Sequence, residues 1–103
     1  MAFLESIKNR WAAFEQRAFP PMPEGRVIAG HNVTLLQSEI GAAIVSCITM
    51  NGTLGTRQRI ALEKSLGSLD VVLKTLPEGE AKIHFSQLAE LGKAVLGNSL
   101  SIA

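Results

Sequence analysis

The chain has 103 residues, of which 47% are hydrophobic and 18% are charged, and its formal net charge is +1. This length suits one domain, residues 1–103, and the composition excludes both a disordered chain and a basic arm for nucleic acid. No apolar run is long enough to span a bilayer, and charged residues near the start interrupt the apolar core that an export signal needs. We therefore expect a cytoplasmic protein, and the single cysteine, Cys47, fits a reducing compartment, where disulfides do not persist.

The first predicted element is an amphipathic helix over residues 2–19. Its apolar side chains recur every three or four positions, which is the helical period, so they share one face. Pro20, Pro21 and Pro23 end this helix, because proline has no amide hydrogen to donate to the helical ladder. Residues 20–31 are expected to form an extended crossover, since the sequence shows no second strand with which they could pair. The apolar face comprises Phe3, Leu4, Ile7, Trp11, Phe14 and Ala18.

A second helix is predicted over residues 32–50, with Asn32 as the N-cap. An asparagine side-chain oxygen can accept a hydrogen bond from a backbone amide of the first turn, which otherwise has no partner within the helix. Residues 41–50 include no charge, and Val45 and Ile48 point away from the main apolar face. A helix that is apolar on all sides is normally buried on more than one side. This helix is therefore either central in the fold or part of an interface. Its main face comprises Val33, Leu36, Ile40, Ala43, Ile44, Cys47 and Met50.

The third predicted helix, residues 56–76, follows a glycine-rich turn. Its start could hold an anion, but we favour the simpler interpretation of a turn with Thr56 as N-cap. Leucines spaced by four and three residues form a seam typical of helical bundles, and Ile60 and Val71 lie on the opposite side. The seam comprises Leu62, Leu66, Leu69, Leu73 and Leu76, and the expected ion pairs along its edges are Arg59 with Glu63 and Asp70 with Lys74.

The fourth predicted helix, residues 80–96, ends at Gly97, because glycine tolerates the left-handed conformation that often follows a helix. The remaining tail, residues 98–103, is expected to fray or to pack only lightly. Together the four elements predict an all-α fold, a small four-helix bundle with a Pro-rich crossover between the first two helices. The buried face of the last helix comprises Ala81, Phe85, Leu88, Leu91 and Val95.

His84 is the strongest candidate for a metal ligand, since it lies in the apolar face of the fourth helix with Glu80 one turn earlier. A zinc or iron site needs three or four ligands, and only His31 and Glu39 could complete the set. We expect no metal site and no cofactor. A histidine at the edge of the core is more simply explained by a hydrogen bond to a backbone carbonyl.

No arrangement of residues predicts catalysis or nucleic-acid binding, and we expect no enzyme. Cys47 lies in an apolar helix, where burial raises a thiol pKa and suppresses nucleophilicity. A small basic cluster is interrupted by Glu63, and a weak helix-turn-helix likeness over residues 86–102 leaves no room for a recognition helix. The basic cluster comprises Arg57, Arg59 and Lys64.

The apolar surface predicted on the second and third helices favours a non-enzymatic protein–protein interaction module that self-associates, and we expect a homodimer through these two helices. The expected interface residues are Val45, Ile48, Ile60 and Val71. Such a module could act as an adaptor, a regulator or an inhibitor of another protein, and we expect neither nucleic acid nor membrane as partner. Two alternatives stay open: the crossover residues Val27 and Ile28 cover this surface, or the bundle binds an apolar small molecule in its core near His84 and Cys47.

Overall fold

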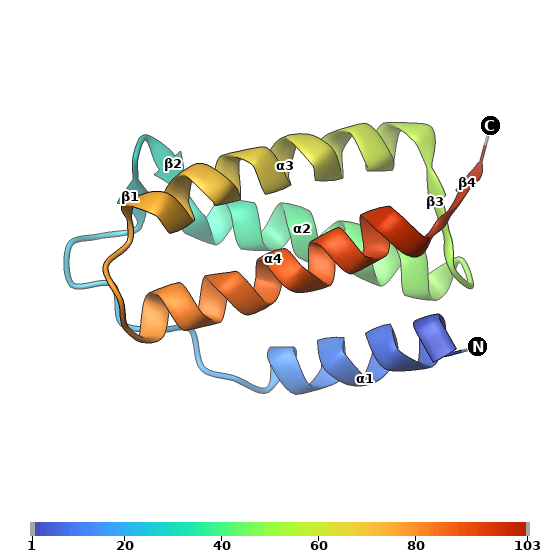
Figure 1. Cartoon of the computed structure of the whole chain (residues 1–103), viewed down its shortest axis with the longest axis horizontal. Helices are drawn as coiled ribbons and strands as arrows, with labels where there is room; N and C mark the ends of the chain where they lie inside the picture. The colour runs from blue at the N-terminus through green and yellow to red at the C-terminus, as the bar shows by residue number, and fades with distance from the viewer. Residues whose placement is uncertain (1, 103) are drawn as a thin grey trace.

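Over residues 2–102, the part of the chain that it describes, the computed structural model is an all-α bundle of four helices with four very short strands. This confirms the predicted fold class. In Figure 1 the helices run along the long axis of the molecule, and α1 and α3 lie on opposite sides of the α2–α4 pair. The elements are α1 (Ala2–Glu15), β1 (Val27–Ile28), β2 (His31–Asn32), α2 (Val33–Thr49), β3 (Thr53–Gly55), α3 (Thr56–Thr75), α4 (Glu80–Asn98) and β4 (Leu100–Ile102).

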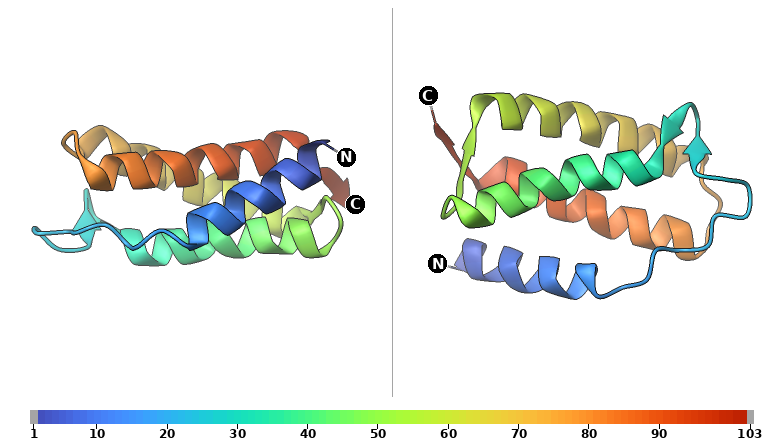
Figure 2. Two further views of the ribbon diagram at one scale, coloured as in Figure 1. Left: turned by 90° about the horizontal axis from the view of Figure 1, so that it is seen from below. Right: turned by 180° about the vertical axis from the view of Figure 1, so that it is seen from behind.

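The core is formed by the apolar faces that the helical period predicts, and α2 and α4 share the central position. Met50 is an exception: it is predicted on the main face of the second helix but is 51% exposed, because it lies at the C-cap, where the helix ends. The right-hand view of Figure 2 looks onto α2, which lies between α1 and α3 with α4 behind it. None of the helices within residues 2–102 combines the length and the hydrophobicity needed to cross a bilayer. The largest fully buried side chains are Phe85, Ile7, Ile40, Ile44, Leu54, Leu62, Leu69, Leu88, Val33, Val72, Val95 and Cys47.

α1 ends at Glu15 rather than at residue 19, so the predicted C-terminal boundary of this helix is wrong. A turn closed by the Arg17 amide on the Phe14 carbonyl (3.0 Å) follows the helix, and Ala18 is exposed instead of joining the apolar face. The chain leaves the helix early because Phe19 packs edge-on against Phe85, with ring centroids 5.8 Å apart. Residues that precede proline also favour extended backbone.

The crossover contains a small antiparallel pair, β1 with β2, where the sequence predicted an unpaired loop. Ala29 and Gly30 connect the two strands with φ angles of 52° and 82°. Positive φ at both central residues is typical of the tight turn that matches strand twist in a hairpin. Strands of two residues are too short to show an alternation of apolar and polar side chains, and alanine is an unusual residue for this turn. The sequence therefore carries no signal for this hairpin.

The C-terminal tail is paired rather than frayed, which corrects a second expectation. β4 lies parallel to β3, and the Leu100 amide donates to the Gly52 carbonyl over 2.9 Å. α4 continues through Gly97 to Asn98, two residues beyond the predicted end, so the tail leaves the helix beside β3. The long separation of the two strands in the sequence explains why a local pattern could not predict their pairing.

The predicted cap of α2 is confirmed and that of α3 is wrong. Asn32 Oδ1 accepts the Leu35 amide over 3.0 Å at the start of α2. α3 begins at Thr56, but the N-cap is Gly55, whose amide donates to Gln58 Oε1 over 3.1 Å. The glutamine side chain folds back onto the cap and satisfies an amide that the helix leaves free.

The expected ion pairs along α3 are replaced by contacts with α4. Asp70 pairs with Lys93 of α4 at 3.3 Å rather than with Lys74. Arg59, expected to pair with Glu63, donates instead to the carbonyls of Leu96 (2.9 Å) and Ser99 (3.3 Å) and to Ser99 Oγ (3.0 Å). The Arg59 guanidinium lies at the C-terminal end of α4, where the helix dipole is negative and favours a positive charge. An ion pair with Glu63 on the surface of α3 would lack this interaction.

Candidate functional site: outward faces of helices α2 and α3

Three of the four predicted interface residues are exposed large hydrophobic side chains. The exposed fractions are 44% for Val45, 60% for Ile60 and 44% for Val71. Ile48 differs, because it is partly buried and packs against the core. The crossover does not cover Val45, Ile60 or Val71, and Val27 of that segment is itself exposed.

The outward face of α2 presents a row of five exposed residues without any charge. We name it the α2 row: Leu35, Ser38, Ala42, Val45 and Thr49, spaced by three, four, three and four residues. Leu35 is 57% exposed and extends the surface by nearly three turns beyond Val45. Sequence reasoning missed Leu35, although the heptad spacing from Leu35 to Ala42 and Thr49 is a signal that could have identified it.

The outward face of α3 has a different chemistry, because lysines flank its apolar residues. Ile60 and Val71 are eleven residues apart, which is about three helical turns, so they lie on the same side of α3. Lys64 and Lys74 are exposed on this side as well. This surface is therefore apolar and charged, with Lys64 and Lys74 beside the apolar residues and the exposed Glu63 at its edge, whereas the α2 row is apolar and neutral.

Two hydrogen bonds join α2 to α3 and separate these two surfaces. Gln58 Nε2 donates to Ser46 Oγ over 2.7 Å, and Ser65 Oγ donates to Glu39 Oε1 over 3.0 Å. Val45 lies on the other side of α2, one turn after Gly41, which packs against Trp11 of α1. The structure therefore divides the predicted interface residues between two surfaces rather than gathering them into one.

His84 lies at the junction of α1, the crossover, α2 and α4 and is 3% exposed. Its Nε2 lies 2.8 Å from Gln37 Oε1, so the expected backbone carbonyl is replaced by a side-chain amide. Three aromatic rings surround the imidazole at centroid distances of 4.6 Å (Phe14), 5.8 Å (Phe19) and 4.9 Å (Phe85). Burial lowers the pKa of His84 below its ordinary 6.5, and the positive charge of Arg17 lowers it further.

The structure does not bring His84 and Cys47 together. Gln37, the partner of His84, and Cys47 are ten residues apart on α2, a separation of about 15 Å along the helix. A hollow of about 210 Å³ borders His84, and Cys47 is not among the residues that line it. Burial raises the pKa of the Cys47 thiol, and the positive charge of Arg59 offsets part of that increase, so Cys47 resembles a core side chain more than a nucleophile.

Of the histidines and carboxylates weighed as metal ligands, only Glu80 and His84 border a common hollow. Glu39 accepts a hydrogen bond from Ser65, and His84 is engaged with Gln37. Within residues 2–102 no three side chains of histidine, cysteine, aspartate or glutamate lie close enough together to hold a metal ion.

Acidification is expected to destabilise the fold through His84. Because the pKa of His84 is lowered in the folded state, the unfolded chain binds a proton here at higher pH than the folded chain does. The contribution of neutral His84 to stability is therefore present above its ordinary pKa of 6.5 and is lost as the pH falls from there through the lowered folded value. Urea unfolding at several pH values between about 7 and about 5 measures this loss.

The matched variants for this prediction are His84→Gln and His31→Gln, which remove one histidine each. His84→Gln should flatten the pH dependence of the unfolding free energy, whereas His31→Gln should preserve it, since His31 lies in β2, is only half-buried and takes no part in the ring contacts that surround His84. An equal pH dependence in the wild type and in His84→Gln would contradict the assignment to His84.

Comparisons of this chain with protein-family models, with curated proteins and with solved structures find no match in any of the three. Function is therefore inferred from the surfaces and buried groups of the chain itself.

Proposed function

We propose that this chain is a non-enzymatic protein–protein interaction module that forms a homodimer through the outward face of α2. The observation that carries the proposal is the α2 row, five exposed residues that include Leu35 and Val45 and no charge. Burying apolar surface between two copies favours association by about 25 cal/mol per Å², before the costs of ordering are subtracted.

A second copy is the partner that best fits a neutral face. In a two-fold dimer the same surface meets itself, so a surface whose charges all have one sign meets like charge. The α2 row avoids that repulsion. Its small residues Ser38 and Ala42 also allow close approach of two helices, and its spacing of three and four residues is the one at which side chains of paired helices interdigitate.

The face of α3 suits a different partner. Two lysines, Lys64 and Lys74, outnumber Glu63 beside the apolar residues of this face, so an acidic and apolar surface of another protein would complement it. In this proposal α2 makes the homodimer and α3 stays free to contact a second protein, as an adaptor, a regulator or an inhibitor does.

The same proposal places the homodimer in the cytoplasm. The support is that Cys47, the single cysteine of the sequence, is buried and forms no disulfide. An unpaired cysteine fits a reducing compartment, in which thiols stay reduced.

Val45→Glu is expected to convert the dimer into a monomer, because two buried glutamates would face each other across the two-fold axis without partners. Light scattering over a hundredfold range of concentration should give a mass near twice 11.0 kDa for the wild type and near 11.0 kDa for the variant. Circular dichroism checks that the variant folds, and we expect it to, since Val45 is exposed in the monomer.

The matched control is Ile60→Glu, which places the same charge on the exposed face of α3. It should keep the dimeric mass if α2 forms the interface. A wild-type chain that stays monomeric at every concentration, or a Val45→Glu variant that keeps the dimeric mass, would overturn the proposal. Loss of the dimer in Ile60→Glu alone would move the interface to α3.

A further inference from the structure

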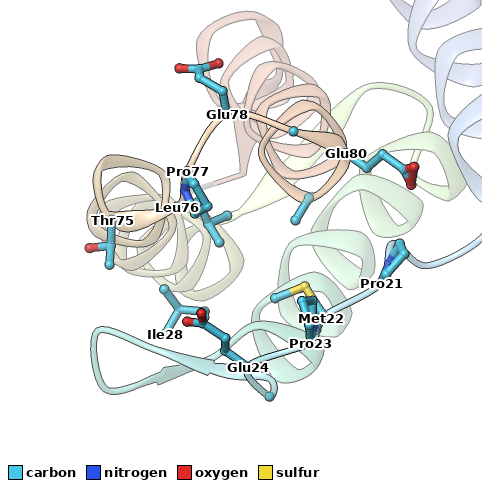
Figure 3. A pocket seen from close by; sticks show the side chains of 13 residues that line it. Pro21, Met22, Pro23, Glu24, Ile28, Thr75, Leu76, Pro77, Glu78 and Glu80 are labelled. Carbon is cyan, nitrogen blue, oxygen red and sulfur yellow. The ribbon is translucent and has the colours of Figure 1, made fainter.

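A groove opens at the end of the bundle where the crossover approaches the turn between α3 and α4. One wall is residues 21–25 with Ile28, and the other wall is residues 75–81. Figure 3 shows these two segments facing each other across the opening, with Met22 and Leu76 projecting toward the space between them. The cavity has a volume of about 360 Å³, which lies within the range of small-molecule sites in proteins.

The inner surface of the groove is apolar and its walls are stiff. Leu76 is buried, and Met22, Ile28 and Ala81 are half-buried around it. Prolines stand in both walls, at positions 21, 23 and 77, and fix the φ angle of the backbone there. A methionine among them lets the surface adapt to the shape of an apolar ligand, because its side chain is flexible and polarizable.

The charged residues that line the groove are all acidic: Glu24, Glu78 and Glu80, with no lysine or arginine. Glu78 is neutralised by Lys82, whose Nζ lies 3.1 Å from its carboxylate. Glu24 and Glu80 are exposed and form no ion pair within the described part of the chain. In Figure 3 they lie on different sides of the opening, Glu24 beside Ile28 and Glu80 toward Pro21.

Helix dipoles do not change the sign of this charge. The C-terminus of α3 and the N-terminus of α4 both open at the groove, and their partial charges have opposite signs and offset each other. The two unpaired carboxylates, Glu24 and Glu80, therefore determine that a positively charged group is favoured at the mouth.

We propose that this groove binds a small organic cation, a molecule with an apolar body and a protonated amine. The body occupies the space between Met22, Ile28 and Leu76, and the ammonium group lies at the mouth near Glu24 or Glu80, where charge complementarity favours it. This site is separate from the α2 row and does not depend on the proposed homodimer.

The test titrates n-hexylammonium into the full chain and follows backbone amide signals by NMR, with n-hexanoate and n-hexanol as matched probes of equal length. Hexylammonium should cause saturable shifts confined to residues 21–28 and 75–81. Hexanoate should cause no saturable shift there, and hexanol should bind more weakly than the amine. The Val45→Glu monomer should bind the amine equally well, which separates failure here from failure of the homodimer proposal.

The charge at the mouth is tested with Glu24→Gln combined with Glu80→Gln, both at exposed positions where folding should be unaffected. This pair should weaken binding of hexylammonium by up to about fivefold, since an exposed ion pair contributes up to about 1 kcal/mol. Glu63→Gln, an exposed glutamate on α3 outside the groove, is the matched control and should change nothing.

Four results would overturn the proposal. They are hexanoate binding as tightly as the amine, shifts that lie outside the groove, an equal loss of binding in Glu63→Gln, and no saturation by hexylammonium at millimolar concentration. If hexylammonium does not bind but a short peptide of leucine and lysine binds in the groove, the groove is assigned to a protein partner instead.

Discussion

Replacing Phe85 by alanine is expected to lower the free energy of unfolding by about 3–5 kcal/mol. Phe85 is fully buried, and its ring packs edge-on against Phe19 of the crossover and against His84. Alanine would leave a cavity where α4 meets the crossover. It would also remove the aromatic contacts that hold the crossover against the bundle.

Equilibrium unfolding in urea measures this effect. The urea concentration at the midpoint should fall in the variant relative to the wild type, while the dependence of the unfolding free energy on urea concentration stays the same. All proteins should be compared at one concentration, because association would add to the apparent stability. Ile83→Ala is the matched control, since Ile83 lies on the same helix but is exposed, and we expect a change below about 0.5 kcal/mol. A loss below about 1 kcal/mol in Phe85→Ala would show that this ring is not part of a tightly packed core.

The second large effect is expected for Arg59→Met, which should lower the free energy of unfolding by about 2 kcal/mol. The guanidinium holds the last turn of α4 through the carbonyls of Leu96 and Ser99, and methionine would leave both without this donor. The expected loss is smaller than the sum of the hydrogen bonds. Arg59 Nε is buried without a partner, and its removal recovers part of the cost of desolvation.

Hydrogen exchange gives a second measurement that a general loss of stability would not reproduce. The Leu100 amide donates to Gly52, and this bond lies next to the Ser99 contacts of Arg59. Its exchange should accelerate in Arg59→Met more than that of core amides in α2. Arg57→Met, at an exposed position in the same turn of α3, should leave both stability and exchange unchanged. Unchanged exchange at Leu100 in Arg59→Met would contradict the role of Arg59 in anchoring the tail.

The sequence by itself determined the four helices, because the signals for them lie within a few residues of each other. Apolar side chains at the helical period produce a buried face whatever the partner, and Asn32 caps α2 with an amide only three residues away. The exposure of Val45, Ile60 and Val71 follows from the same period, since each lies opposite a buried face. This much of the candidate interface could therefore be predicted.

The tertiary structure alone decided how those faces are connected. Arg59 reaches Leu96 across 37 positions, and His84 reaches Gln37 across 47, so no local pattern pairs them. A side chain with several partners within reach takes the one that the packing of the helices brings nearest. For the same reason the sequence placed the interface residues on one surface, whereas the packing of α2 against α3 separates them.

Gly92 shows this division at a single residue. Judged from the sequence alone, Gly92 lowers the stability of α4, because glycine has a low helix propensity. In the fold a Cβ at this position would lie 2.8 Å from Leu66 Cδ2 and 3.2 Å from Ile40 Cγ2, so the absence of a side chain lets α4 approach both neighbours closely. The helical period determined that α4 forms and which face it buries. Only the close packing of three helices decided that this position has no room for a larger residue.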